Sequence, residues 1–312
     1  MLDIGEVFSA LLGLFLLIGV GFAGAKVGVL STEHTPQLSR LLMNITMPAT
    51  LFSALVQPFD AAFMREGVLI VLLGSAFILL GGAISWGCSY PCQVKSSRRG
   101  CWVFSCMFNN NGFMGFPIAL ALFGQEGLAL AAFLSIPFSI LAFTLGAKLM
   151  VLDGQRTEQT ETISWKSILL TPVNGAMVLG LFFYILQIPL PSALSTPITH
   201  LSNVTTPLSM LITGITLSGG EVKQIFCNRD AITASLMRLL ILPLLTVAGL
   251  RLVPIDNPVF VGVMVVIMSM PAAAVGTILA DTYGADTEFA AETVFLSSIL
   301  CLVTIPLMTL LL

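Results

Sequence analysis

Long apolar segments recur along this sequence and restrict what it can fold into. A helix needs roughly 20 apolar residues to cross the hydrocarbon core of a bilayer, which is about 30 Å thick. Runs of this kind lie at about 7–26, 38–57, 67–88, 101–122, 128–150, 167–187, 198–218, 231–252, 258–280 and 288–311. Lipid offers the backbone no hydrogen bonds, so each run has to form a helix that satisfies its own backbone groups. We therefore expect an all-α membrane protein of about ten transmembrane helices.

The composition supports lipid as the solvent for most of the chain. Apolar residues make up 56% of the 312 residues and charged residues 9%, whereas a soluble domain carries about 25% charged residues. The sequence contains no basic stripe of the kind that binds nucleic acid. Its six cysteines show neither C-x-x-C spacing nor a nearby histidine, so we expect no metal site, disulfide or cofactor.

Basic residues are distributed unevenly between alternate connections, which predicts an orientation in the membrane. One set of connections holds Arg65 and Arg251, and Arg238 lies inside a span. The other set holds Lys26, Arg40, Lys95, Arg98, Arg99, Lys148, Arg156, Lys166, Lys223 and Arg229. Because cytoplasmic loops carry the excess of Lys and Arg, we expect both termini on the non-cytoplasmic side. The polar stretch 153–166 is expected to be a cytoplasmic linker.

The two halves of the chain resemble each other at three places in the same order. Leu42–Pro48 reads LMNITMP and Leu201–Pro207 reads LSNVTTP. Two shorter matches follow, FPIA at 116–119 with MPAA at 270–273, and FLS at 133–135 with FLS at 295–297. Five spans in each half is an odd number, so the second copy enters the membrane from the opposite side. We therefore expect residues 1–152 and 167–312 to form two inverted five-helix repeats.

The fourth span contains an unusual group of polar and helix-breaking residues. Three adjacent amides are followed by two glycines and a proline, namely Asn109, Asn110, Asn111, Gly112, Gly115 and Pro117. Amides are costly at membrane depth unless they meet a partner, water or a ligand. Glycine and proline unwind a helix, and unwound backbone is tolerated where it lines a cavity. The group therefore indicates a binding site, and a kinked helix with interhelical amide hydrogen bonds is the alternative.

The ninth span has Pro271 and Gly276 at a comparable depth. In inverted repeats, substrate sites lie near the midplane at discontinuous helices in corresponding positions. We therefore expect the broken helices 4 and 9 to cross, with half-helix N-termini directed at one point. Because these ends carry partial positive charge, they favour an anion. The pattern predicts a secondary transporter for a small organic anion.

Three segments resemble the auxin efflux carrier family, which includes plant PIN carriers and bacterial malonate- and malate-type carriers. They are NNGFMGFP from Asn110, FGQEG at Phe123–Gly127, and MPAAAVGTILADTYGAD at Met270–Asp286. The likeness begins at LLMNITMPATLF, residues 41–52, and continues to the C-terminus. It implies two inverted repeats divided into a scaffold and a transport domain, homodimers, and elevator-type alternating access. It also implies a mono- or dicarboxylate substrate and a location in the bacterial inner membrane.

The resemblance also implies roles for individual residues. The carboxylate-binding asparagine of the family falls on Asn110, and the prolines of the crossover fall on Pro117 and Pro271. Val275 stands where many bacterial members have an asparagine, so a side-chain contact from helix 9 is not implied. The expected substrate site comprises Asn109, Asn110, Asn111, Gly112, Gly115, Pro117, Pro271, Ala272 and Ala273.

Two charged residues lie at similar depth inside the membrane. Arg238 is in the eighth span and Glu292 in the tenth, and buried ions at such depth need partners. We expect them to form an ion pair, with either a structural role or a role in proton coupling or substrate binding.

Two other kinds of transporter share the expected architecture. A sodium-coupled symporter of the bile-acid type remains an alternative, because carbonyl and amide oxygens suffice to bind sodium. A cation/proton antiporter would need an acidic side chain beside Asn110 or Pro271, and neither has one nearby in the sequence. An enzyme is not expected, because the two histidines, His34 and His200, lie at span ends and cannot complete a catalytic or metal-binding set.

Overall fold

The structure is a computed structural model that describes residues 4–153, 171–219 and 228–311. Within these ranges the named elements are all helices. Five are long and apolar enough to cross a membrane, Val7–Lys26, Ala61–Ser89, Asn111–Asp153, Arg229–Leu250 and Thr287–Thr309. Pro172–Leu186 and Pro258–Met268 are shorter apolar helices. The all-helical membrane protein predicted from the sequence is confirmed, whereas ten spans in inverted repeats stay a prediction. The expected linker at 153–166 lies outside the described residues except for Asp153.

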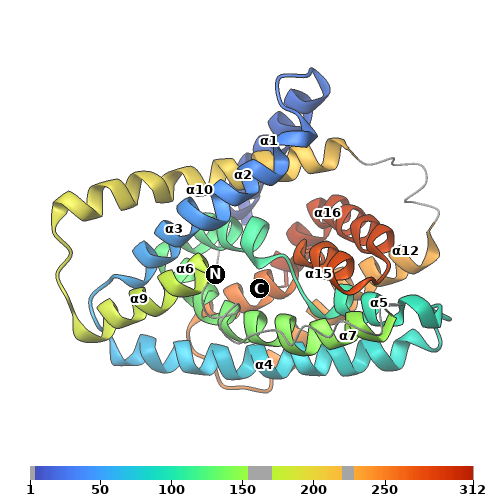
Figure 1. Ribbon diagram of the computed structural model, residues 1–312. Coiled ribbons are helices and arrows are strands. Elements are labelled where there is room, and N and C mark those ends of the chain that lie inside the picture. Colours follow the sequence, from blue (N-terminus) through green and yellow to red (C-terminus); the bar gives the residue numbers. More distant parts are fainter. Residues whose placement is uncertain (1–3, 154–170, 220–227, 312) are drawn as a thin grey trace.

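In one group of helices, α10 packs against α1, α2 and α3, and α9 packs against α3 (Figure 1). This group consists of α1 (Ile4–Lys26), α2 (Thr35–Leu41), α3 (Met47–Leu55), α9 (Pro172–Leu186) and α10 (Ser192–Ser218). The α1 and α10 backbones approach closely at Gly21 and Gly214, where a side chain would clash with the backbone of the opposite helix. Close approach through small residues is the usual way for helices to associate in lipid.

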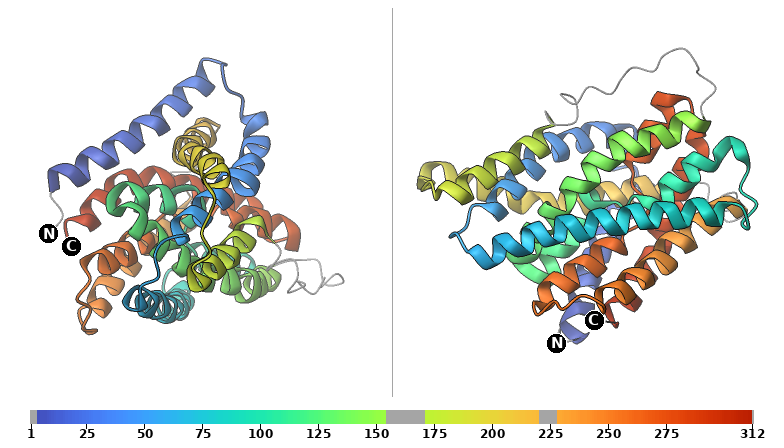
Figure 2. Two further views of the ribbon diagram at one scale, coloured as in Figure 1. Left: turned by 90° about the vertical axis from the view of Figure 1, so that its left-hand side faces the viewer. Right: turned by 90° about the horizontal axis from the view of Figure 1, so that it is seen from below.

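The remaining helices form a second group. They are α4 (Ala61–Ser89), α5 (Arg99–Met107), α6 (Phe116–Leu141), α7 (Ala147–Asp153), α12 (Arg229–Leu236), α13 (Leu242–Leu250), α14 (Pro258–Met268), α15 (Val275–Tyr283) and α16 (Thr287–Thr309). Helix α4 runs along the whole group, and the start of α1 lies close to the end of α16 in both views of Figure 2. Short π-helical turns link consecutive helices, including η4 (Asn111–Gly115) and η6 (Met237–Ile241).

Two of the helical segments in the second group are interrupted. The first has an extended break at Phe108–Asn110, between α5 and η4. The second is interrupted between Met268, where α14 ends, and Val275, where α15 begins. Pro271 has no N–H to continue the helix, and an asparagine side chain competes for backbone hydrogen bonds. Both breaks therefore fall where the sequence predicted them.

The glycine contact between α1 and α10 can be tested by adding bulk. We expect Gly21→Leu to lower the free energy of unfolding by about 1–3 kcal/mol, because the added side chain overpacks a tight contact. Gly13→Leu, on the same helix, is the control, because a Cβ atom added at Gly13 would meet no other atom within 4 Å. Thermal unfolding of both variants in detergent gives the comparison. Equal melting temperatures would show that the close approach is not required.

Candidate binding site at the crossing of two broken helices

The two breaks are joined to each other through their backbones. The Asn110 N–H donates to the Pro271 carbonyl at 2.8 Å, and the Ala273 N–H donates to the Phe108 carbonyl at 3.1 Å. Asn109 and Ala272 face each other as an isolated antiparallel bridge. Unpaired backbone groups are costly in an apolar environment. Each broken helix therefore supplies the partners that the other has lost.

The side chain of Asn109 connects the two broken helices at this crossing. Its side-chain Nδ2 donates to the carbonyl of Ile267 at 2.6 Å, near the C-terminal end of α14. Its side chain lies in the interior, with 1% of the residue exposed. Asn109 therefore ties the break in one helix to the end of the other.

Asn110 is placed differently from its neighbour. It caps the N-terminus of η4, because its Oδ1 accepts from the Phe113 N–H at 3.3 Å. Its Nδ2 has no hydrogen-bond partner within the described ranges, and 8% of the residue is exposed. A capping side chain with an unused donor at a helix N-terminus is suited to receive a carboxylate oxygen.

Asn111 carries a polar atom that the structure leaves unsatisfied. Its Oδ1 is buried and has no hydrogen-bond partner among the described residues, and the same holds for Oδ1 of Asn109. Buried amide oxygens are normally satisfied by protein, water or a ligand. The crossing thus contains more hydrogen-bonding capacity than the protein itself uses.

The small residues and prolines bring the backbones together. A side chain at Gly112 would meet Met43 and Met47 at ordinary contact distance, so this face of η4 lies against the first helix group. Gly115 packs closely against Ile267, where an added Cβ would come within 2.9 Å of the isoleucine side chain. Pro117 directly follows the π-helical turn η4 inside a continuous helix that begins at Asn111, and such a local π adjustment is one way in which a helix tolerates a proline.

The other half of the crossing is buried among the helices of the second group. Pro271, Ala272 and Ala273 are all buried. The Ala272 N–H donates to Oγ of Ser297 on α16 at 3.1 Å. In the sequence, Ser297 stands out only as part of a repeated tripeptide. Its contact with the crossing could not be found from spacing, because the two residues are far apart along the chain.

The expected ion pair of Arg238 with Glu292 is wrong. Arg238 donates through Nε to the Met270 carbonyl at 2.9 Å, through Nη1 to the Cys106 carbonyl at 3.1 Å, and through Nη2 to the Met268 carbonyl at 2.7 Å. Glu292 instead accepts a hydrogen bond from the side chain of Asn228. Matched depth and opposite charge suggested the pair, but the broken helices offer free carbonyls that are closer partners for the guanidinium.

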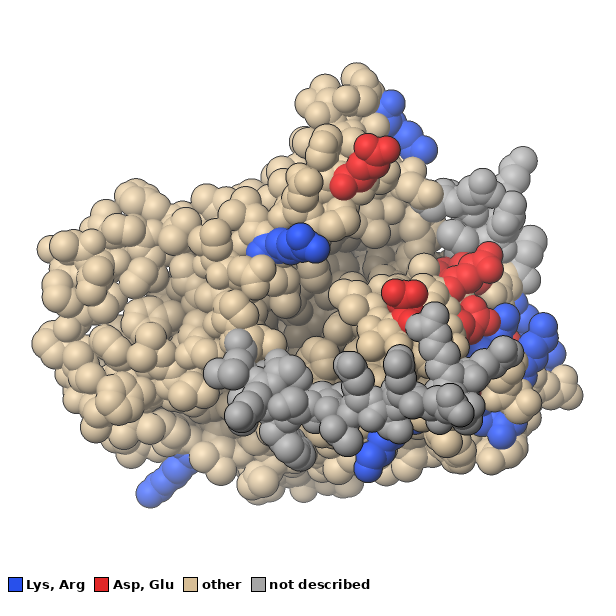
Figure 3. Space-filling model, viewed as in Figure 1, with Lys and Arg blue, Asp and Glu red and all other residues tan. Residues whose placement is uncertain are grey.

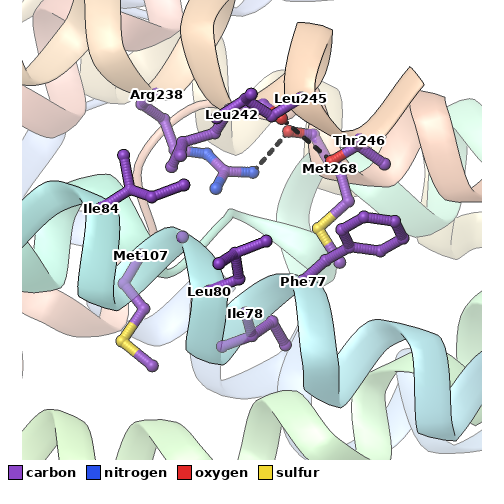
Figure 4. Close-up of a pocket in the computed structure, with 11 residues that line it drawn as sticks. Phe77, Ile78, Leu80, Ile84, Met107, Arg238, Leu242, Leu245, Thr246 and Met268 are labelled. Atoms are coloured by element: carbon purple, nitrogen blue, oxygen red, sulfur yellow. Dashed lines mark hydrogen bonds between the residues drawn. The ribbon is translucent and has the colours of Figure 1, made fainter. Parts of the chain in front are cut away.

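A small pocket lies beside Arg238, on the side of the crossing that faces α4 and α13 (Figure 4). Its walls are mostly apolar and include Phe77, Leu80, Leu242 and Leu245. Its volume of about 20 Å³ is enough for one or two water molecules. The pocket is too small for a dicarboxylate, and Asn110 is not among the residues that line it.

Most of the charged side chains visible in Figure 3 lie toward one end of the molecule, and the rest of this face is formed mainly by uncharged residues. At this end Arg98 pairs with Asp286 at 2.8 Å and with Asp230 at 3.6 Å. The Asp153 carboxylate accepts from the N–H groups of Gly100 and Cys101, at 2.9 and 2.7 Å. These contacts fix the first turns of α5, α12 and α16 relative to one another. The centre of the same face is hollowed, between the two helix groups.

A helical membrane protein with two interrupted helices crossing at buried amides belongs, by fold and site, to the membrane transporters. Comparison with known families agrees, because the family described as "Membrane transport protein" matches residues 6–309. The chain therefore belongs to this family, the auxin efflux carrier family, as the sequence motifs predicted.

Curated relatives match along almost their entire length. An "Uncharacterized transporter" of Methanothermobacter thermautotrophicus is 28% identical, and the match covers 96% of each chain. An "Uncharacterized transporter" of Methanocaldococcus jannaschii is 27% identical, with 94% of each chain covered. A protein of Rhizobium meliloti named "Putative malonate transporter" is 21% identical, with 96% of this chain and 94% of the relative covered.

Asn109 and Asn111 differ in their hydrogen bonding, so their replacement should affect stability differently. We expect Asn109→Ala to lower the free energy of unfolding by about 1–3 kcal/mol, because the carbonyl of Ile267 loses a buried donor. Asn111→Ala should cost less, since it removes an oxygen that has no partner. Thermal unfolding of the two purified variants measures the difference. Equal losses would contradict the structural role given to Asn109.

Proposed function

We propose that this protein is a secondary transporter that moves a small organic anion, a mono- or dicarboxylate, across the membrane. The observation that carries the proposal is the Asn110 side chain, which caps a helix N-terminus with its oxygen and has an unused amide donor. A carboxylate bound there would accept a charge-assisted hydrogen bond and meet the positive end of the helix dipole. Gly112 and the side chains of Asn109 and Asn111 would complete the lining, with the two unpaired amide oxygens accepting from water or from a donor group of the substrate and not from its carboxylate.

The two helix groups suggest how such a carrier would work. In the proposed arrangement, residues 1–152 and 167–312 are inverted five-helix repeats, joined by the linker 153–166. The group around α10 would be the scaffold and the group containing the crossing would be the moving transport domain. Asn110 is almost completely enclosed in this structure, so the substrate would reach it after one group moves relative to the other, as in an elevator. We propose a homodimer in the bacterial inner membrane as the working unit.

Malonate is the natural first probe of the substrate class. The name of the Rhizobium meliloti relative refers to malonate, and the whole-length match makes a related small carboxylate a reasonable substrate here. Among the described residues, the hydrogen-bond partners at the crossing are backbone groups and the side chains of Asn109, Asn110, Arg238 and Ser297, and none is a carboxylate. That argues against an antiporter that would bind protons there, and leaves the sodium-coupled alternative to experiment.

Uptake into proteoliposomes tests the proposed function. The purified protein is reconstituted and offered radiolabelled acetate, malonate, succinate and benzoate, with empty liposomes as the control. We expect saturable uptake of at least one of these carboxylates, together with exchange against the same unlabelled anion. The absence of protein-dependent uptake of all four would reject a small carboxylate as substrate.

Replacing Asn110 tests the site itself. We expect Asn110→Ala to weaken binding of the transported carboxylate by about tenfold to a hundredfold, because a charge-assisted hydrogen bond contributes about 1.5–3 kcal/mol. Calorimetry on protein that elutes like wild type gives the affinity. Asn44→Ala, at an exposed asparagine outside the crossing, is the matched control. An unchanged affinity in Asn110→Ala would remove this residue from the site.

The orientation can be tested by labelling engineered cysteines in a cysteine-free background. Ser96 lies in the basic connection between α4 and α5, and Asp256 lies in the connection between α13 and α14; both are exposed. We expect a membrane-impermeant thiol reagent, applied to intact cells, to label Asp256→Cys and not Ser96→Cys, because basic connections stay in the cytoplasm. The reverse pattern would invert the proposed topology.

A further inference from the structure

Arg238 is a buried cation without a carboxylate partner. It lies in η6, in the middle of the span Arg229–Leu250, with 2% of the residue exposed. Within the described part of the chain its guanidinium forms no ion pair, and its three hydrogen bonds all go to backbone carbonyls. A charged side chain at this depth is costly and is retained for a structural or functional reason. The arrangement of its carbonyl partners indicates which.

The three carbonyls belong to the C-terminal ends of the two broken helices. Cys106 is in the last turn of α5, Met268 is the last residue of α14, and Met270 follows in the break. In an unbroken helix the Cys106 carbonyl would accept from the N–H of residue 110, but that N–H donates to Pro271. The C-terminal end of a helix carries partial negative charge. Such ends, with unwound carbonyls, are where transporters of this architectural type coordinate a coupling sodium ion.

We infer that the Arg238 guanidinium occupies the cation site of the crossing and replaces a bound coupling ion. The inference rests on the proposed carboxylate transport and adds that this transport does not require sodium. Three carbonyl oxygens from two helix ends surround one positive charge, as they would around a metal cation. The guanidinium is covalently part of the chain, so the charge is present in every step of the cycle.

The fixed charge also determines the sign of the substrate. At the crossing, helix C-termini with partial negative charge meet the N-termini of the η4–α6 segment and α15, which carry partial positive charge. Arg238 neutralises the negative ends and leaves the positive ends facing the region of Asn110. A sodium ion at the same carbonyls would be repelled by the guanidinium, whereas a carboxylate on the Asn110 side would be attracted. Arg238 is therefore a positioning residue that makes the site selective for an anion.

The inference can be tested by chemical rescue with a small cation, because a pocket lies beside Arg238. Its walls come from α4 and α13, and it borders the guanidinium (Figure 4). Shortening the side chain enlarges this space and frees the three carbonyls for a small cation. In Arg238→Ala, added guanidinium or sodium should occupy the vacated position, while a variant that keeps the charge needs no such addition.

The experiment measures uptake of radiolabelled acetate, malonate, succinate and benzoate in proteoliposomes, and melting temperature in detergent, each with sodium or choline as the cation. For the wild type we expect the same uptake and the same melting temperature in both salts. For Arg238→Ala we expect at least a tenfold loss of uptake, and a gain in melting temperature with guanidinium or sodium that choline does not give. Arg238→Lys should retain more uptake than Arg238→Ala, and Arg251→Gln, at an exposed arginine near the end of the same span, should behave like wild type.

The outcomes separate this inference from the proposed function. A sodium requirement for wild-type uptake, or a wild-type melting temperature raised by sodium over choline, would overturn the inference and leave carboxylate transport standing. Wild-type uptake by Arg238→Ala without added cation would also overturn it. If the wild type transports no carboxylate in either salt, the proposed function fails, and the melting temperatures alone decide the cation site. If Arg238→Ala does not fold, the wild-type salt comparison and Arg238→Lys still decide it.

Discussion

The structure depends on the exchange of backbone hydrogen bonds between two interrupted helices. Inside a membrane no water is available for the groups that an interruption exposes, and each unsatisfied group costs several kcal/mol. The bonds from Asn110 to Pro271 and from Ala273 to Phe108 meet this requirement by letting each break satisfy the other. Neither interruption could exist in this form without its partner, so the two breaks have to cross.

This constraint explains why polar groups collect at one place in an otherwise apolar molecule. The backbone exchange leaves carbonyls at two helix ends, which Arg238 and Asn109 bind. It also leaves helix N-termini, one of which Asn110 caps while its amide donor stays unused. Two helix C-termini are thus occupied by groups of the protein itself. In the proposed function, the N-terminal side would receive the ligand and select an anion, because the unfilled helix ends there carry partial positive charge.

The sequence was informative where residue type alone decides the local structure. Apolar runs predicted membrane helices, and the cluster of asparagine, glycine and proline at 109–117 predicted an interruption, because these residues disrupt helices wherever they occur. The motifs from Asn110 and from Met270 also led to the family. Pairing was harder to predict. The hydrogen bond between Ala272 and Ser297 forms because helix packing brings the two residues together, and it cannot be predicted from their spacing in the sequence.

The error over Arg238 has a specific physical cause. From the sequence, a buried arginine calls for an acidic partner, and Glu292 was at a suitable depth. Backbone carbonyls do not appear in a sequence as candidate partners, because in most helices they are already bonded. Interruptions in two neighbouring helices leave several backbone carbonyls without their helical partners. The two predicted interruptions could therefore have indicated carbonyl partners for Arg238. An arginine without a nearby acid, in a chain with broken helices, is better assigned to the helix ends.

The central claim is that a carboxylate binds on the Asn110 side of the crossing, opposite Arg238. An experimental structure of the protein with a bromine-labelled carboxylate, such as bromoacetate or bromomalonate, would test it most directly. We expect anomalous density for bromine near η4, with a carboxylate oxygen within about 3 Å of the Asn110 amide, a normal hydrogen-bond distance. Density in the pocket between α4 and α13, or outside the crossing, would contradict it.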